Sequence, residues 1–340
     1  MKVVFFLADL YGGGAEKVSL TIINQLAFKN DVTLILVREN GAFFKDINSQ
    51  VSVIVLNSGS VYKSFFALYS ELKIIQPDIL ISSLDSANLL ATFVSKCLKI
   101  KNITIIHGIV SFKYKNNRLM KFLIKGLCYS TLNIAVSKGV KEDLKKFSIT
   151  SKVIFNPTII KTHSSKKEKL VLAVGRLETV KNYKILIDAF NLAQLKEYHL
   201  IILGDGSLRN ELQYYIDKNK IINIELLGFV NPHEFYKKAT LLVSSSKSES
   251  FGNVVVEALS YGVNIVATKT VGSEEILEYG KYGTLVPIDN IELLAKAIEK
   301  KILNPLEETF LKARAREFEV NKIMNNYEKT IEELVNVDFN

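Results

Sequence analysis

The chain has 340 residues, of which 48% are hydrophobic and 23% charged, with only 5 prolines and 17 glycines. Such a length exceeds a single core of about 100 to 200 residues, and the composition excludes both a disordered chain and a small disulfide-stapled scaffold. The formal charge of +9, from 44 basic and 35 acidic residues, indicates an anionic partner such as a nucleotide, a nucleic acid or an acidic membrane surface.

The first half of the chain alternates short apolar, β-branched runs with helical patterns. Runs that are apolar throughout are typical of parallel strands buried on both faces, because helical crossovers cover each side of the sheet. Strands are therefore expected at residues 3–8, 32–37, 51–56, 78–83, 103–107 and 132–137.

A glycine-rich turn, Gly12 to Gly14, separates the first expected strand from a helical pattern. Glycines there let the backbone approach a ligand, and the N–H groups at a helix start favour phosphate, although a plain turn is the alternative. Neither this turn nor the Gly-Asp-Gly at 204–206 continues as G-x-G-x-x-G, and G-x-x-x-x-G-K-[ST] is absent. A nicotinamide dehydrogenase is disfavoured and a P-loop NTPase is excluded.

The positive charge is concentrated in one window of the first half. Residues 1–160 hold 20 basic and 10 acidic side chains, residues 161–340 hold 24 and 25, and no acidic residue lies between Asp85 and Glu142. Helical spacing in residues 111–130 predicts a basic and an apolar face, which suits an anionic membrane or the pyrophosphate of a polyprenyl-linked acceptor. An ordinary helix with a solvated lysine face is the alternative. The basic residues expected to make these contacts are Lys113, Lys115, Arg118, Lys121 and Lys125.

The pattern stops at residues 156–169, which are polar, contain a proline and lack periodicity, and it then restarts. Further strands are expected at residues 170–175, 199–204, 223–228, 239–245 and 263–268. The sequence therefore predicts two doubly wound α/β domains joined near residue 160, a class that binds ligands at the carboxyl ends of its strands and between domains. Residues 313–337 have helical spacing, and whether this helix packs on the second domain or returns to the first stays open.

Arg176 and Lys181 follow the first strand of the second domain, five residues apart. At such a strand end the two can converge on a diphosphate, because Arg binds as a fork and Lys as a point charge. Each residue alone could instead be a solvated surface charge.

Glu249 and Glu257 flank a predicted helix start at residues 250–253. The N–H groups of that start can hold a phosphate or a sugar hydroxyl, while Glu257 can accept hydrogen bonds from a ribose diol. The two carboxylates could also form an acid/base pair or be two exposed glutamates.

Two cysteines, Cys97 and Cys128, have no Cys-x-x-Cys spacing and no His cluster nearby, so reduced thiols are expected rather than a disulfide or a metal site. The apolar run after the start is too short for a signal-peptide core, and no run reaches about 18 apolar residues. These features predict a protein that is made and kept inside the cell.

Five motifs in order, GGGAEK, VGRLETVKN, LGDGSLRNEL, LLGFV and ESFGNVVVE, resemble those of the family 4 retaining glycosyltransferases of GT-B fold. The resemblance spans essentially the whole chain and is greatest to bacterial transferases that extend lipid-linked oligosaccharides, such as O-antigen, capsule or protein-glycan precursors. It implies an α/β fold of two doubly wound, Rossmann-like domains facing a cleft. Residues 1–158 would be the acceptor-binding domain, with the C-terminal helix 320–340 as a candidate addition, and residues 159–319 the nucleotide-sugar donor-binding domain.

The resemblance also implies roles for individual residues. Arg176 and Lys181 would neutralise the donor diphosphate as catalytic residues. Two further catalytic residues are expected: Glu249 would contact the transferred sugar, and His107 would lie near the sugar and the acceptor. A lone His at a strand end is otherwise more often structural. The expected donor-binding residues are Gly13, Gly14, Arg176, Lys181, Gly228, Phe229, Val230, Phe251, Gly252, Asn253 and Glu257.

Within the donor-binding set, Glu257 would bind the ribose, the backbone of residues 227–230 would line the base pocket, and the amides of residues 251–253 would hold the sugar. Many relatives have Pro-Glu where this chain has Ser273-Glu274-Glu275, so which Glu faces the donor stays open, with Glu275 the closer match. Further candidates for the site are Glu16 and Asn156.

Because no Asp-x-Asp occurs, the leaving diphosphate is expected to be stabilised by Arg176, Lys181 and helix N-termini rather than by a metal, and no cofactor is implied. The resemblance implies retaining, front-face transfer of a sugar from a nucleotide sugar, a UDP-sugar, to a polyprenyl-diphosphate-linked oligosaccharide. The enzyme would be cytoplasmic and peripherally bound to the inner face of the cytoplasmic membrane.

Two alternatives stay open. One is a nucleotide-sugar epimerase of GT-B shape, which uses the same kind of cleft. The other, from a different class, is a nucleic-acid-binding protein that uses the basic window. It is disfavoured because the window lacks the interleaved aromatic platform of single-strand binders and leaves the two glutamates unexplained. No nucleic-acid partner is therefore expected.

Overall fold

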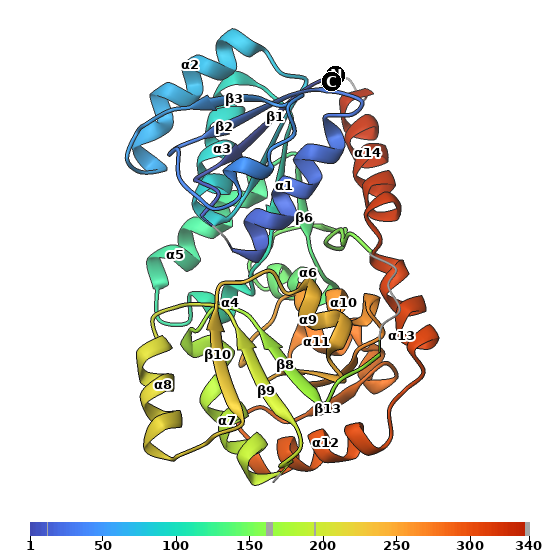
Figure 1. The fold of residues 1–340 in the computed structure, drawn as a ribbon. Coiled ribbons are helices and arrows are strands. Elements are labelled where there is room, and N and C mark those ends of the chain that lie inside the picture. Colours follow the sequence, from blue (N-terminus) through green and yellow to red (C-terminus); the bar gives the residue numbers. More distant parts are fainter. Residues whose placement is uncertain (12, 161–165, 194, 337–340) are drawn as a thin grey trace. The chain divides into compact units, whose positions relative to one another are not determined.

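The computed structural model describes residues 1–11, 13–160, 166–193 and 195–336 of the chain (Figure 1). The chain divides into two compact units. The first unit comprises Met1–Pro157 and Val320–Asn340, and the second unit comprises Thr158–Glu319. The second unit is thus continuous in sequence, whereas the first is made of two segments.

A seven-stranded parallel sheet forms the centre of the first unit. Its strands are β1 (Lys2–Leu7), β2 (Asp31–Leu36), β3 (Ser52–Val55), β4 (Ile79–Ser83), β5 (Asn102–Ile106), β6 (Leu132–Ala135) and β7 (Lys152–Val153). Their order is β3-β2-β1-β4-β5-β6-β7, so the direction of the crossovers reverses between β1 and β4. All residues of β4 and β5 are buried, which is why these strands are apolar on both faces.

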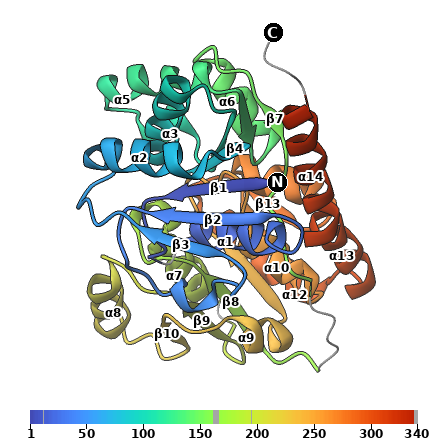
Figure 2. The same cartoon turned by 90° about the horizontal axis from the view of Figure 1, so that it is seen from above.

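The helices of the first unit cover both faces of this sheet. They are α1 (Gly14–Leu26), α2 (Phe65–Ile75), α3 (Asp85–Leu98), α4 (Val110–Lys113), α5 (Arg118–Leu123), α6 (Lys138–Lys145) and α14 (Val320–Asn336). Figure 2 shows α1 on one face and the pair α2 and α3 on the other. Leu68 and Leu72 of α2 and Val94 of α3 pack with Val4 and Phe6 of β1 in one buried core.

The C-terminal helix α14, for which the sequence left two places open, is part of the first unit. It contacts α1, and Lys29, in the turn after that helix, forms an ion pair with Glu328 at 2.8 Å. Lys152 of β7 donates a hydrogen bond to the Thr330 hydroxyl at 2.9 Å. The apolar face of α14, with Ile323 and Tyr327 at its centre, is buried.

A six-stranded parallel sheet forms the centre of the second unit. Its strands are β8 (Leu170–Val174), β9 (His199–Leu203), β10 (Ile224–Gly228), β11 (Leu241–Ser244), β12 (Asn264–Thr268) and β13 (Thr284–Val286). Their order is β10-β9-β8-β11-β12-β13, and the reversal here falls between β8 and β11.

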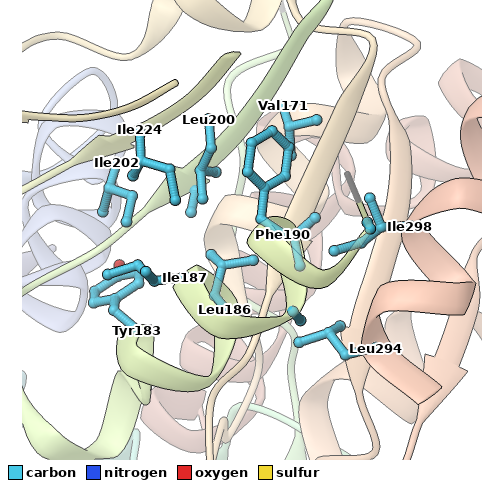
Figure 3. Close-up of a cluster of buried hydrophobic side chains, with 14 of the residues drawn as sticks. Val171, Tyr183, Leu186, Ile187, Phe190, Leu200, Ile202, Ile224, Leu294 and Ile298 are labelled. Atoms are coloured by element: carbon cyan, nitrogen blue, oxygen red, sulfur yellow. The ribbon is translucent and has the colours of Figure 1, made fainter. Parts of the chain in front are cut away.

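The main apolar core of the second unit lies between this sheet and three helices. Figure 3 shows Leu186 and Phe190 of one helix packed between strand residues such as Val171 and the side chains of Leu294 and Ile298. Each such side chain contributes about 1.5 to 3 kcal/mol when fully buried. The helices of this unit are α7 (Tyr183–Leu192), α8 (Arg209–Lys218), α9 (His233–Lys238), α10 (Asn253–Ser260), α11 (Val271–Ile276), α12 (Ile291–Leu303) and α13 (Glu308–Ala315).

The predicted fold class is confirmed, because each unit is a doubly wound α/β sheet. All expected strands are present, with ends that differ by about two residues at most, as is usual for such boundaries. Sequence analysis missed β7 and β13, which are edge strands of only 2 and 3 residues. Part of the expected linker, residues 161–165, lies outside the described residues.

Candidate functional site

The loops after β8 and β11, where the strand order of the second unit reverses, meet through an ion pair. Lys181 ends the short 3₁₀ helix Thr179–Lys181 after β8, and its ammonium pairs with the carboxylate of Glu249, which follows β11. Their side chains are only 21% and 14% exposed, so water screens the pair in part. Open α/β sheets bind ligands at this position, outside the carboxyl ends of the strands.

Hydrogen bonds from the serine-rich segment after β11 hold the two loops together. The Ser245 hydroxyl donates to the Lys181 carbonyl at 2.8 Å, and the Ser246 hydroxyl donates to Glu249 Oε1 at 2.9 Å. The Lys247 N–H donates to the Val180 carbonyl at 2.8 Å. Lys181 and Glu249 were both selected from the sequence, and the structure brings them together. Hydrogen bonds to the backbone of the Lys181 loop and to the Glu249 side chain hold them in place.

Gly175 lets the β8 loop turn closely around polar side chains. Its φ is +151°, and a Cβ there would lie 2.9 Å from the Tyr183 hydroxyl and 3.1 Å from Lys181 Cε. The Tyr183 hydroxyl is buried and has no hydrogen-bond partner in the described part of the chain. Burial, followed by the charge of Glu249, raises its pKa, so the phenol stays neutral. Arg176, the next residue after Gly175, is exposed.

The segment from Glu249 to Asn253 is held from both sides. Helix α10 begins at Asn253 with Gly252 as its N-cap, and φ +94° at Gly252 is a conformation that favours glycine. Phe251 is buried and packs edge-on against Phe318, with ring centroids 5.5 Å apart. The Gly272 N–H donates to the Glu249 carbonyl at 2.8 Å, and a Cβ on Gly272 would lie 2.3 Å from the Phe251 carbonyl oxygen. This helix start is thus built by close backbone packing.

The predicted base-pocket segment follows β10 in the same sheet. Gly228 ends that strand with φ +78°, and its carbonyl accepts a hydrogen bond from the Gly204 N–H at 2.7 Å. Phe229 and Val230 come next and are 66% and 38% exposed, so they offer apolar surface beside the strand end.

Glu257, the predicted ribose ligand, lies one turn into α10. Its Oε2 accepts a hydrogen bond from the Tyr236 hydroxyl at 3.0 Å. Sequence analysis did not select Tyr236, because a tyrosine within a helical pattern is indistinguishable from an ordinary core residue.

Glu274 and Glu275 point to different surroundings. Glu274 lines a cavity of about 460 Å³ together with Lys269 and Tyr279. The side-chain Oε1 of Glu275 is buried. The backbone carbonyl of Glu275 accepts a hydrogen bond from Arg314 Nη2 at 2.9 Å. That Glu275 faces the donor stays a prediction.

In the first unit, the strand order reverses beside the glycine-rich turn. Gly13 is the N-cap of α1 and Gly14 is its first residue, whereas Gly12 lies outside the described residues. A Cβ on Gly13 would lie 2.3 Å from Glu16 Oε2, so the Glu16 carboxylate folds back over the helix start, where negative charge is stabilised. Asn156, the other lower-ranked candidate, is 2% exposed.

His107 follows β5 at the same edge of this sheet. Its Nε2 is buried without a hydrogen-bond partner among the residues that the structure describes. Burial lowers the pKa of the imidazole to about 4, although the charge of Asp85 acts in the opposite direction. The ring is therefore neutral at pH 7 and has one N–H donor and one acceptor nitrogen.

Asp85, which sequence analysis did not select, gathers the polar groups near His107. Its Oδ2 accepts from the Lys113 ammonium and from the Tyr114 hydroxyl, each at 2.6 Å. The Asp85 side chain is 7% exposed and that of Lys113 is 51% exposed. Burial and the bond to Asp85 raise the pKa of Tyr114, so it remains a donor. Asp85 lies two residues after the expected strand 78–83, and this position at a strand end was the signal that could have identified it.

The basic window does not form the continuous amphipathic helix expected for residues 111–130. That part of the window instead forms α4, α5 and a 3₁₀ helix, Ile124–Tyr129, and the Asn117 side chain caps α5 by accepting from the Met120 N–H at 2.9 Å. The expected apolar face is also divided, because Leu127 is fully buried whereas Leu119 and Phe122 are 66% and 71% exposed. Lys113 lies before Asn117, where the helix is interrupted, and pairs with Asp85. Lys115, Arg118 and Lys125 are exposed. Lys121 is half-buried and donates to the Lys115 carbonyl at 3.0 Å.

Two negative findings apply to the described part of the chain. No group of three or more His, Cys, Asp and Glu side chains there is arranged to hold a metal ion. Among the helices described, none combines the length and apolar character that crossing a membrane requires.

Two family models match nearly the whole chain between them. The model described as Glycosyltransferase Family 4 matches residues 12–162, and the model described as Glycosyl transferases group 1 matches residues 155–318. The boundary between the two matches falls at the junction of the two units.

Curated relatives match the chain over almost its full length. One from Campylobacter jejuni, GalNAc-alpha-(1->4)-GalNAc-alpha-(1->3)-diNAcBac-PP-undecaprenol alpha-1,4-N-acetyl-D-galactosaminyltransferase, is 30% identical over 367 aligned residues and covers 99% of each chain. A second from the same organism, N-acetylgalactosamine-N,N'-diacetylbacillosaminyl-diphospho-undecaprenol 4-alpha-N-acetylgalactosaminyltransferase, is 29% identical and covers 95% of this chain and 97% of its own.

Solved structures share the fold at lower identity. Anabaena HepE, solved in complex with UDP and glucose, superposes with a TM-score of 0.84 at 22% identity, over 98% of this chain and 99% of its own. WaaG, a glycosyltransferase of lipopolysaccharide biosynthesis, superposes with a TM-score of 0.74 at 16% identity, over 98% and 100%. The GT-B fold class expected from the sequence is thus confirmed.

Proposed function

Since the chain belongs to the family 4 glycosyltransferases of GT-B fold, we propose that it transfers a sugar from a UDP-sugar to a polyprenyl-diphosphate-linked oligosaccharide in bacterial glycan assembly. The acceptor class is supported by the two C. jejuni relatives, whose names specify undecaprenol diphosphate carriers. The HepE complexes with UDP and with UDP-glucose make UDP the nucleotide to test first.

The observation that carries the proposal is the ion pair of Lys181 and Glu249 at the strand reversal of the second unit. A transferase needs a cation for the departing diphosphate and a hydrogen-bond acceptor for the sugar hydroxyls, and this pair supplies both within one hydrogen-bond length. Arg176, exposed at the end of β8, adds a second cation. The donor would therefore lie with its diphosphate at Arg176 and Lys181 and its sugar at Glu249.

We propose a retaining, metal-independent reaction at this site. The bond between sugar C1 and the β-phosphate oxygen would break while the acceptor hydroxyl attacks C1 from the same face, and the acceptor proton would pass to the departing phosphate oxygen. Arg176 and Lys181 would stabilise the charge that grows on the diphosphate. Neutral His107 would hydrogen-bond the sugar or the acceptor without adding charge.

The activity is tested with the full chain and a polyprenyl-diphosphate-linked oligosaccharide. The four donors are the UDP derivatives of glucose, galactose, N-acetylglucosamine and N-acetylgalactosamine. We expect UDP release with one of these donors, and only when the acceptor is present. UDP release without acceptor, or epimerised donor as the product, would contradict the proposal. An α-linkage in the product and unchanged turnover in EDTA are expected. A β-linkage would overturn retention, and loss in EDTA with recovery on added Mg²⁺ would overturn metal independence.

The first unit, in this proposal, binds the lipid-linked acceptor at the inner face of the cytoplasmic membrane. Support comes from α5, where Leu119 and Phe122 are exposed beside Arg118 and the neighbouring basic residues. Apolar side chains beside basic ones are the combination that binds an anionic bilayer surface.

A further inference from the structure

A buried tyrosine hydroxyl contacts Glu257, the carboxylate that the family resemblance assigns to the ribose. Tyr236 lies in α9 and is fully buried, and its hydroxyl donates to Glu257 Oε2 at 3.0 Å. Burial of a hydroxyl is costly unless it is hydrogen-bonded, so this bond restricts where the Glu257 carboxylate can lie.

The Tyr236 ring is itself held in one position. It stacks on the ring of Tyr261, with centroids 5.6 Å apart and an interplanar angle of 30°. The Tyr261 hydroxyl is 3.0 Å from Nδ1 of His233, the first residue of α9. Stacking on Tyr261, whose own hydroxyl is held by His233, therefore restrains the Tyr236 ring and the direction of its hydroxyl.

A half-buried lysine ties together the ends of the helices that carry Tyr236 and Glu257. Lys167 Nζ donates to the carbonyls of Tyr236, Lys237 and Tyr261, at 3.4, 3.3 and 3.0 Å. The first two carbonyls lie at the end of α9, and Tyr261 is the C-cap of α10. These contacts restrain the separation of the two helices, and with it the geometry of the Tyr236–Glu257 bond.

The bond leaves Glu257 able to bind a diol. Each carboxylate oxygen accepts two hydrogen bonds, so accepting from Tyr236 does not exhaust the capacity of Glu257. Burial, followed by the charge of Glu257, raises the pKa of Tyr236, so its hydroxyl keeps its proton at neutral pH and can donate it to Glu257.

We propose that Tyr236 is a positioning residue for nucleotide recognition. It holds the Glu257 carboxylate in the orientation that meets both hydroxyls of a ribose, and so sets the preference of the site for ribonucleotides over nucleotides that lack the diol. The inference rests on the proposed function, and on the role of ribose ligand that the family resemblance implies for Glu257.

The test measures binding of UDP and of 2′,3′-dideoxy-UDP to the full chain by calorimetry. We expect Tyr236→Phe to weaken UDP binding about tenfold, the loss of one hydrogen bond to a charged group, and to change dideoxy-UDP binding less than about twofold. Tyr261→Phe, which keeps a stacking ring but removes the neighbouring hydroxyl, is the matched control and should leave the ratio of the two affinities unchanged.

Equal weakening of both ligands by Tyr236→Phe, or no weakening of either, would overturn the inference, because a purely structural role does not distinguish the two nucleotides. Glu257→Gln separates this failure from failure of the premise. If Glu257→Gln also leaves the affinity ratio at the wild-type value, the ribose assignment is wrong and the inference falls with it. If Glu257→Gln removes the preference, adding Tyr236→Phe to it should reduce the ratio no further, and melting temperatures verify that each variant is folded.

Discussion

The two units place a carboxylate at the same point of the same kind of sheet, yet they pair it differently. In the second unit, Lys181 and Glu249 come from the loops of adjacent strands, and both side chains are mostly buried. In the first unit, Asp85 is buried after β4 while its partner Lys113 comes from α4 and is half-exposed. The sheet therefore determines where polar groups gather, and the loops determine whether the cation is enclosed or faces solvent.

Buried titratable groups also differ between the units. In the first unit, His107 has a pKa lowered to about 4. In the second, the buried groups near the candidate site are the phenols of Tyr183 and Tyr236, whose pKa values are raised, so they carry no charge at neutral or acidic pH. Acid is therefore expected to act first on the first unit.

The largest effect is expected from the enclosed cation of the second unit. Lys181→Ala should lower kcat by about 100- to 1,000-fold, the range seen when one stabilising group is removed from a developing oxyanion. Arg176→Ala should also lose most turnover. Steady-state kinetics with the donor and the lipid-linked acceptor measure both.

Lys184 offers a matched control for Lys181, because it lies on α7 in the same unit and is exposed over the Tyr215 ring. Lys184→Ala should leave turnover within about twofold, since exposed substitutions away from a site have small effects. Near-normal turnover of folded Lys181→Ala or Arg176→Ala would remove these residues from the proposed mechanism.

The next effect concerns acid stability of the first unit. Because the pKa of His107 is lowered in the folded state, unfolded chains bind more protons between about pH 6.5 and 4, and stability is lost as the pH falls through that window. Relative to His107→Gln, the wild type should lose up to about 3 kcal/mol of unfolding free energy over this range.

Urea unfolding at several pH values checks this expectation. His199→Gln is the control, because His199 is exposed at the start of β9 in the second unit. A difference between wild type and His107→Gln that stays constant with pH would show that the imidazole does not titrate in this way.

A smaller effect is expected for membrane binding by the first unit. The chain should co-sediment with vesicles of anionic lipid but not with neutral vesicles, and neutralising Lys121 and Lys125 with Gln should weaken binding by about 2 kcal/mol, roughly 1 kcal/mol for each charge. Reversing both charges should abolish it. The same two substitutions at Lys218 and Lys220, on the second unit, should change nothing, and unchanged sedimentation after reversal would exclude this surface.

The smallest effect compares the two ion pairs directly. Lys113→Met should cost about 1 kcal/mol of unfolding free energy, because a half-exposed cation is screened by water. Lys181→Met should cost more, about 2 kcal/mol, because both partners of that ion pair are mostly buried and their attraction is screened less by water. Urea unfolding of the two variants gives the order, and the reverse order would contradict the distinction between enclosed and exposed cations.

Sequence analysis selected both partners of the ion pair in the second unit but only Lys113 of the pair in the first, for a physical reason. Lys181 and Glu249 follow buried apolar strands within a few residues, so strand positions alone place them at one edge of the sheet. Asp85, Lys113 and Tyr114 come together only through packing of α3 against a segment 28 residues further along. No local pattern contains that contact.

The prediction of one continuous helix at residues 111–130 was wrong for a related reason. Its spacing of basic residues assumed an uninterrupted helix, whereas Asn117 caps a new helix and Asp85 holds Lys113 before the break. Tyr236 was not selected from the sequence, because periodicity predicts that a residue is buried but does not identify the hydrogen-bond partner of its hydroxyl.

The way the chain enters and leaves the second unit has a practical consequence. The Thr158 N–H donates to the Phe318 carbonyl at 2.8 Å, and Thr158 and Glu319 form an isolated parallel bridge, so the ends of this unit lie together. Residues 158–319 are one contiguous segment of the chain, so two cuts in the gene delimit this unit. The first unit cannot be obtained by truncation, because ending the chain at residue 157 discards α14, and joining residue 157 to residue 320 is the minimal route to it.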